Sequence, residues 1–132
     1  MSEKIAIESR RSQLSRARGT GSAHSGVHHW YAERITAIAL VPLTLWFVFS
    51  MLRLSGAPQE TVAQWAAHPV NTVLLLALIG MTFHHMQLGI QVVLEDYVDA
   101  KWLMNVLILV NKGAALFLGL LAAVAVLKLS LL

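Results

Sequence analysis

The sequence contains no cysteine, and only 13% of its 132 residues are charged. Without cysteine the chain can form no disulfide, and it can ligate no iron–sulfur cluster or thiolate zinc site. Any metal or cofactor must therefore be bound through nitrogen, oxygen or methionine sulfur. Hydrophobic residues make up 57% of the chain, which indicates a single domain of membrane-protein composition.

Basic residues are concentrated before the first apolar run. Such a cluster is typical of an orientation signal at a membrane rather than of nucleic-acid binding. Glu3 and Glu8 argue against a mitochondrial transit sequence, and no small-x-small cleavage site follows, so we interpret residues 1–26 as a retained, polar, basic N-terminal arm of a bacterial protein. Its last part, residues 19–26, is rich in glycine and serine and is predicted to be flexible. The clustered cations are Lys4, Arg10, Arg11, Arg16 and Arg18.

Three apolar runs are long enough to cross a bilayer, and we predict helices over about 30–54, 70–96 and 102–131. Pro42 interrupts the first of them only mildly. The segment from Ser55 to His68 contains glycine and proline but no lysine or arginine, so we expect a short loop on the translocated side. Residues 27–132 are thus predicted to form an all-α membrane domain of three transmembrane helices that packs with a partner subunit.

The distribution of cations predicts the orientation of these helices. The N-terminal arm and the loop at 97–101 carry most of the lysine and arginine, whereas the other side has only Arg53 and Lys128. We therefore expect a multi-pass protein of the bacterial inner (cytoplasmic) membrane, with a cytoplasmic N-terminus and a periplasmic C-terminus. Lys112, inside the third apolar run, is interpreted as a residue that snorkels towards the interface.

Two adjacent histidines, His84 and His85, lie deep in the second predicted helix, where polar side chains are costly and are candidates for function. His85 shares a helix face with Gly89 and Asp96, whereas His84 points about 100° away. A neutral imidazole is a good axial ligand for haem iron, and Gly89 leaves room for a flat macrocycle beside His85. The alternative is that the histidines only hydrogen-bond a neighbouring helix and that the glycine allows close helix packing.

Polar residues at the cytoplasmic ends of the helices complete the candidate site. Arg34 is placed to bind haem propionates, with His28 close by in sequence, although Arg34 can also snorkel or pair with a neighbouring acid. Asp96 opposes the helix dipole at the end of the second helix, which favours a partner or a proton-transfer role for it. The Tyr97 hydroxyl can hydrogen-bond a quinone carbonyl while its ring stays in apolar contact.

These residues make the chain resemble the small hydrophobic membrane-anchor subunit family of succinate dehydrogenase, respiratory complex II. The resemblance implies that His85 is an axial ligand of haem b, whose second ligand comes from a partner anchor (cytochrome b) subunit. It also implies that Arg34 lies near the propionates, and that Tyr97 and Asp96 help form a ubiquinone site facing the iron–sulfur subunit. The motifs that carry it are Gly26-Val27-His28, Arg34-Ile35-Thr36-Ala37-Ile38, and His85 with Gly89 and Asp96-Tyr97-Val98.

One position departs from the pattern of the family. Members commonly have an acid after the histidine of the Gly-Val-His segment, and this chain has His29 there, so the role of that acid is not carried over. The resemblance otherwise implies a subunit that catalyses nothing alone. It would work with the second anchor, iron–sulfur and flavoprotein subunits in the tricarboxylic acid cycle and the respiratory chain.

Two other functions fit parts of the sequence. One is a haem-free structural anchor of a quinone-linked or other membrane complex, whose histidines only bridge helices. The other is a small ion or proton conductor that uses His84, His85 and Lys112. We expect no repeated polar stripe along any helix, which disfavours the conductor.

Overall fold

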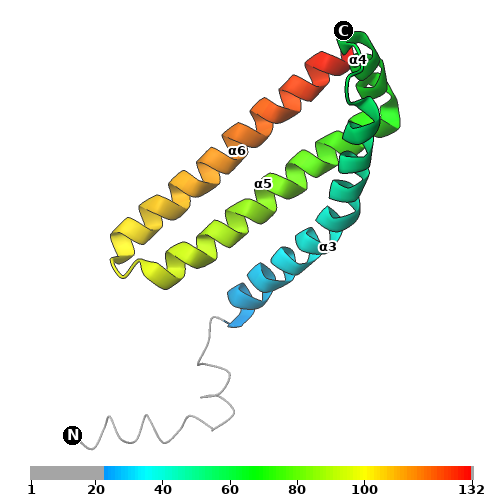
Figure 1. Ribbon diagram of the computed structural model, residues 1–132. Helices are drawn as coiled ribbons and strands as arrows, with labels where there is room; N and C mark the ends of the chain where they lie inside the picture. Colours follow the sequence, from blue (N-terminus) through cyan, green and yellow to red (C-terminus); the bar gives the residue numbers. More distant parts are fainter. Residues whose placement is uncertain (1–22, 132) are drawn as a thin grey trace, which may run out of the picture. The chain divides into compact units, whose positions relative to one another are not determined.

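The computed structural model describes residues 23–131, and this part of the chain is helical apart from short connections. Its helices are α3 (Ala23–Leu54), α4 (Gln59–Ala67), α5 (Pro69–Tyr97) and α6 (Lys101–Leu131), shown in Figure 1. Three of them, over Gly26–Leu54, Pro69–Tyr97 and Lys101–Leu131, are long and apolar enough to cross a membrane. The prediction of an all-α protein with three such helices is therefore confirmed. Predictions for residues 1–22 lie outside the described residues.

The chain divides after Tyr31 into two compact units, and α3 begins in the first and continues into the second. We predicted a helix from about residue 30 after a flexible segment, but α3 starts at Ala23. Gly26 lies inside α3 and does not prevent the earlier start, since one glycine costs a helix only about 1 kcal/mol relative to alanine. Pro42 lies inside α3 and does not end it.

The segment after α3 was predicted to be a loop, and this prediction is wrong, because residues 59–67 form the helix α4. Gly56 has a φ of 78°, the left-handed conformation that commonly ends a helix, and it lies two residues after Leu54, the last residue of α3. Pro58 immediately precedes α4, and Pro69 is the first residue of α5. These residues mark helix ends rather than a continuous loop. Between them the sequence contains neither glycine nor proline.

Two side chains of α5 hold the corner between α4 and α5. Asn71 Nδ2 donates to the Trp65 carbonyl at 2.8 Å, and Thr72 Oγ1 donates to the Ala66 carbonyl at 2.6 Å. These carbonyls lie in the last turn of α4, where backbone acceptors have no partner within the helix. Trp65 also stacks on Trp46 of α3, with ring centroids 5.7 Å apart. The short helix is thus attached to both of its neighbours in sequence.

The helices α5 and α6 lie side by side and antiparallel, joined by a short connection at Val98–Ala100 (Figure 1). Leu75 and Leu88 of α5 and Ala115 of α6 are among the few buried hydrophobic residues. A Cβ atom added to Gly119 would lie 3.5 Å from Phe83, so α6 approaches α5 closely at this glycine. Small residues at a helix contact of this kind are typical of packing in membranes.

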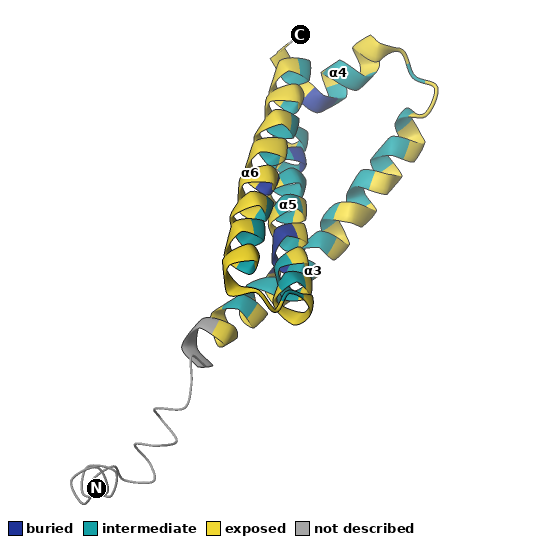
Figure 2. Cartoon of the chain, turned by 90° about the vertical axis from the view of Figure 1, so that its left-hand side faces the viewer, coloured by how far each residue is buried: buried dark blue, intermediate teal, exposed yellow. Residues whose placement is uncertain are grey.

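Many large apolar side chains of the described residues are exposed, and Figure 2 shows exposed positions along the long helices. Ile38 of α3 is 71% exposed and Leu109 of α6 is 72% exposed. Water would disfavour such a surface, whereas lipid tails or apolar partner helices solvate it without cost. The described chain therefore has the surface of a protein that lies within a bilayer.

Candidate functional site

His85 lies near the middle of α5, and its ring is held by a residue of α3. The Nδ1 atom of His85 is 2.9 Å from Oγ1 of Thr36, a contact between residues 49 positions apart in sequence. Thr36 is only 5% exposed, and its hydroxyl is also within hydrogen-bond distance of two carbonyls of its own helix. The described residues place no hydrogen-bond partner on His85 Nε2. One ring nitrogen is therefore engaged, and the other remains available.

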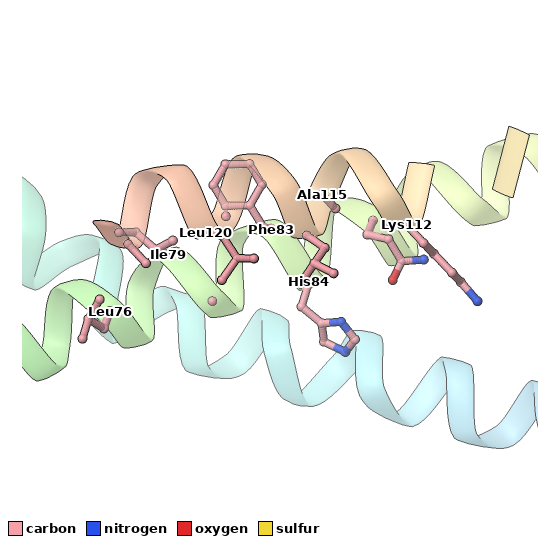
Figure 3. Close-up of a pocket in the computed structure, with 12 residues that line it drawn as sticks. Leu76, Ile79, Phe83, His84, Lys112, Ala115 and Leu120 are labelled. Carbon is pink, nitrogen blue, oxygen red and sulfur yellow. The ribbon is translucent and has the colours of Figure 1, made fainter. Parts of the chain in front are cut away.

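His84 has different surroundings, in agreement with the predicted 100° difference in direction. It is exposed and lines a cavity of about 380 Å³ between α5 and α6 (Figure 3). Phe83, Ala115 and Leu120 contribute to the mainly apolar wall of this cavity, and Lys112 lies at its edge. The two histidines thus have different surroundings. Among the described residues, His85 is bonded to a side chain of another helix and His84 is not.

Gly89 lies one turn after His85 on the same helix. A Cβ atom placed on Gly89 would meet no heavy atom of the described residues within 4 Å, so no neighbouring helix of this chain uses the glycine for close packing. The glycine at which two helices of this chain pack closely is instead Gly119, on α6. Space beside Gly89 is what a flat macrocycle ligated by His85 would require.

A row of polar side chains runs along α5, and it was not predicted from the sequence. Gln87 Nε2 donates to Gln91 Oε1 at 3.0 Å, and Gln91 Nε2 donates to Glu95 Oε1 at 2.8 Å. Asn111 of α6 donates to the Gln87 carbonyl at 2.9 Å. The expectation that no helix carries a repeated polar stripe is therefore wrong. Its signal was the spacing of four residues between these side chains, which places them on one helix face.

This row gives α5 a polar strip towards one end only. From Gln87 to Glu95 it extends about 12 Å, whereas the hydrocarbon core of a bilayer is about 30 Å thick. Gln87 is 7% exposed, and it is one of two buried polar residues in the described part of the chain, the other being Thr36. The row links the cytoplasmic end predicted for α5 with its middle and joins α5 to α6. By itself it does not cross a membrane.

The predicted quinone-site residues end α5. Asp96 and Tyr97 are its last two residues, both are exposed, and Tyr97 is 83% exposed. The next residue, Val98, donates its backbone N–H to the Leu94 carbonyl at 3.0 Å and so completes the final turn. Because α5 is continuous from His85 to Asp96, these residues share a face about 16 Å apart along the axis.

The predicted propionate-binding residues both belong to α3. Arg34 is exposed and lies two residues before Thr36, about 200° around the helix, so its backbone position is on nearly the opposite face from the His85 contact. His28 is also exposed, but it belongs to the first unit of the chain. The structure brings neither residue into a hydrogen bond with His85. Their roles stay predictions.

A haem fits these residues in two respects. His85 has one bonded and one available ring nitrogen, as axial histidine ligands commonly do. Gly89 leaves the adjoining helix surface open.

Fold and site together define a class: a helical, multi-pass membrane protein with an oriented imidazole in the middle helix. Residues 8–129 match the model of the family described as succinate dehydrogenase/fumarate reductase transmembrane subunit. The chain belongs to this family, as its resemblance predicted.

Several relatives support the same assignment. The succinate dehydrogenase hydrophobic membrane anchor subunit of Rickettsia bellii is 38% identical over 102 residues, which are 77% of this chain and 82% of that protein. The protein of the same description from Rickettsia conorii is 33% identical over 101 residues, 76% of this chain and 80% of its own length. The one from Paracoccus denitrificans is 32% identical over 83 residues, 61% of this chain and 63% of its own length.

Proposed function

We propose that this chain is the membrane-anchor subunit of a bacterial succinate:ubiquinone oxidoreductase. It would lie in the inner membrane with its N-terminus in the cytoplasm. A second membrane-anchor subunit, the cytochrome b subunit, would lie beside it. Iron–sulfur and flavoprotein subunits would bind at the cytoplasmic face and deliver electrons from succinate. Membership of the family and three apolar helices support the anchor role.

The observation that carries the haem part of the proposal is the state of the His85 ring. Its Nδ1 atom is bonded to Thr36 at 2.9 Å, which leaves Nε2 as the nitrogen for iron. Gly89 would leave space for the macrocycle, and Arg34 is the candidate partner of its propionates. Bound haem b would supply a one-electron redox centre within the membrane. The second axial ligand would come from the partner anchor subunit.

The quinone part of the proposal places ubiquinone at the exposed end of α5. The Tyr97 hydroxyl would donate a hydrogen bond to a quinone carbonyl, and its ring would remain in apolar contact. Asp96 would help to transfer the protons that quinone reduction consumes. Both residues lie at the end of α5 that is predicted to face the cytoplasm, where protons and the iron–sulfur subunit would be available.

A second candidate function, the haem-free structural anchor, is favoured by the same hydrogen bond. In that function, His85 only bridges two helices, and its hydrogen bond with Thr36 is its whole role. The two functions differ in what a substituted side chain must do. A bridging residue needs only a hydrogen-bonding group, whereas a haem ligand needs an imidazole nitrogen.

The test is an optical spectrum of the purified four-subunit complex with His85→Gln, compared with wild type and with His84→Gln. We expect wild type and His84→Gln to show the reduced-minus-oxidised bands of a low-spin b-type haem, and His85→Gln to lose them. Glutamine keeps a hydrogen-bonding side chain, so a merely bridging role would survive the change. A wild-type complex without haem, or a His85→Gln complex with normal haem, would overturn the ligand assignment.

A further inference from the structure

Thr36 belongs to the Arg34–Ile38 motif, but the sequence assigned it no role of its own in the candidate site. It is buried in α3, and three possible hydrogen-bond partners surround its hydroxyl. Oγ1 lies 2.8 Å from the Ala32 carbonyl, 3.0 Å from the Glu33 carbonyl and 2.9 Å from His85 Nδ1. The two carbonyls belong to the preceding turn of the same helix, so their positions are set by the backbone.

The chemistry of these groups favours a proton on one of the two facing atoms, Thr36 Oγ1 and His85 Nδ1, over the other. A threonine hydroxyl has one hydrogen to donate and two lone pairs to accept with, and backbone carbonyls only accept. Two carbonyls therefore compete with the imidazole for the single hydroxyl hydrogen. When that hydrogen points to either carbonyl, Oγ1 accepts from His85, which must then carry its own proton on Nδ1.

This arrangement favours one tautomer of a neutral imidazole. A proton on Nδ1 leaves the lone pair on Nε2, the nitrogen for which the described residues offer no hydrogen-bond partner. The opposite tautomer would place the proton on Nε2 and remove the metal-binding lone pair. In metal sites the partner of the second ring nitrogen commonly sets both tautomer and ring orientation.

We propose that Thr36 is a positioning residue for the haem ligand: by accepting a hydrogen bond from His85 Nδ1, it orients the ring and keeps Nε2 available for iron. This inference rests on the proposed haem-binding function. It also explains why His85 rather than His84 would be the ligand, because among the described residues His84 has no side-chain partner in another helix.

The proposal predicts the direction of two effects. An acceptor at Nδ1 makes the imidazole a more basic ligand, which favours ferric over ferrous iron and lowers the reduction potential of the haem. Loss of the Thr36 hydroxyl should therefore raise the haem potential. It should also weaken haem retention by about 10- to 100-fold, the usual range for loss of such a partner.

The experiment measures haem content, the electron paramagnetic resonance signal of the ferric haem and its midpoint potential in the purified four-subunit complex. Thr36→Val removes the hydroxyl and keeps the shape of the side chain, and Thr36→Ser restores the hydroxyl. Ser50→Ala is the matched control, because Ser50 Oγ donates to the Trp46 carbonyl on the same helix and no hydrogen bond links it to a histidine. We expect Thr36→Val to lose haem and to raise the potential of what remains. Thr36→Ser and Ser50→Ala should behave as wild type.

Each outcome has a distinct meaning. Suppose that the wild type contains haem and that Thr36→Val keeps its haem content, its signal and its midpoint potential. This result would overturn the role of Thr36 and leave the proposed function intact. A wild-type complex without haem would overturn both. If Thr36→Val fails to assemble, Thr36→Ser and Thr36→Ala form a second pair that differs only in the hydroxyl. Equal potentials and haem content in that pair would overturn the inference.

Discussion

At the scale of single residues, His84 and His85 show how one position along a helix changes the chemistry available to a side chain. His85 faces α3 and meets Thr36, whereas His84 faces the cavity between α5 and α6. Their separation by about 100° follows from helix geometry alone. A hydrogen bond to one ring nitrogen is what turns an intramembrane imidazole into an oriented one.

Tyr97 offers a test of the quinone site at the same scale. In the assembled complex, Tyr97→Phe should lower the rate of ubiquinone reduction by succinate by about 2- to 10-fold, because it removes one hydrogen bond and little else. Oxidation of succinate by a water-soluble artificial acceptor should stay normal, since that reaction does not need the quinone site. Tyr31→Phe makes the same change at a tyrosine assigned to no site and serves as the control.

Equal loss of both activities in Tyr97→Phe would contradict a quinone-binding role. It would indicate instead that the substitution disturbs assembly of the complex. Tyr97 is 83% exposed, so the hydroxyl contributes little to the fold of this chain. A specific loss of ubiquinone reduction is therefore the informative result.

At the scale of helices, α5 and α6 are joined by one close approach and one polar contact. The close approach is at Gly119, and the polar contact is the 2.9 Å bond from Asn111 to the Gln87 carbonyl. Hydrogen bonds between membrane helices contribute on average only about 0.6 kcal/mol, so the polar contact alone would stabilise the pair only weakly. The cavity with His84 and Lys112 lies along the same contact.

Substitutions at Gly119 should therefore affect stability in a size-dependent way. Gly119→Leu should destabilise the complex by about 1–3 kcal/mol, because its extra atoms would collide with Phe83 and push α6 away from α5. Gly119→Ala should be tolerated, since its Cβ would make an ordinary contact at 3.5 Å. Gly113→Leu, at a glycine of α6 with open space around it, is the matched control. Thermal unfolding of the purified complex provides the measurement, and equal effects at both glycines would contradict this account.

At the scale of the whole molecule, the described chain has little core of its own. Its buried hydrophobic residues are Ala66, Leu75, Leu88 and Ala115, and none of its large side chains is fully buried. Lipid and partner helices must therefore supply most of the apolar contacts that a soluble domain would make internally. This agrees with membership of a family of transmembrane subunits.

The absence of cysteine makes the predicted orientation directly testable. A single cysteine introduced by Ser55→Cys should react with a membrane-impermeant maleimide in intact spheroplasts, because the positive-inside rule places this segment outside. Asp99→Cys should react only after the membrane is opened with detergent. The unmodified chain, which has no thiol, gives the background. The reverse labelling pattern would show that the N-terminus faces the periplasm.

The sequence by itself determined the features that depend on local composition and helical period. Three apolar runs of spanning length specify three membrane helices, because the bilayer core demands them. The register of His85, Gly89 and Asp96 follows from 3.6 residues per turn once α5 is continuous. The polar row from Gln87 to Glu95 also follows from spacing within one helix, although it was not predicted. The helix α4 was not predicted, because its flanking prolines are also typical of a loop. Pro58 and Pro69 instead mark the limits of the helix.

Only the tertiary structure decided which side chains meet. Thr36 and His85 are 49 positions apart, and no periodicity within either helix indicates that their faces are turned towards each other at the same height. The structure likewise distinguishes Gly119, which packs against Phe83, from Gly89, which has open space beside it. The physical reason is that helical period fixes the direction of a side chain around its own axis. The placement of one helix against another depends on contacts summed over both.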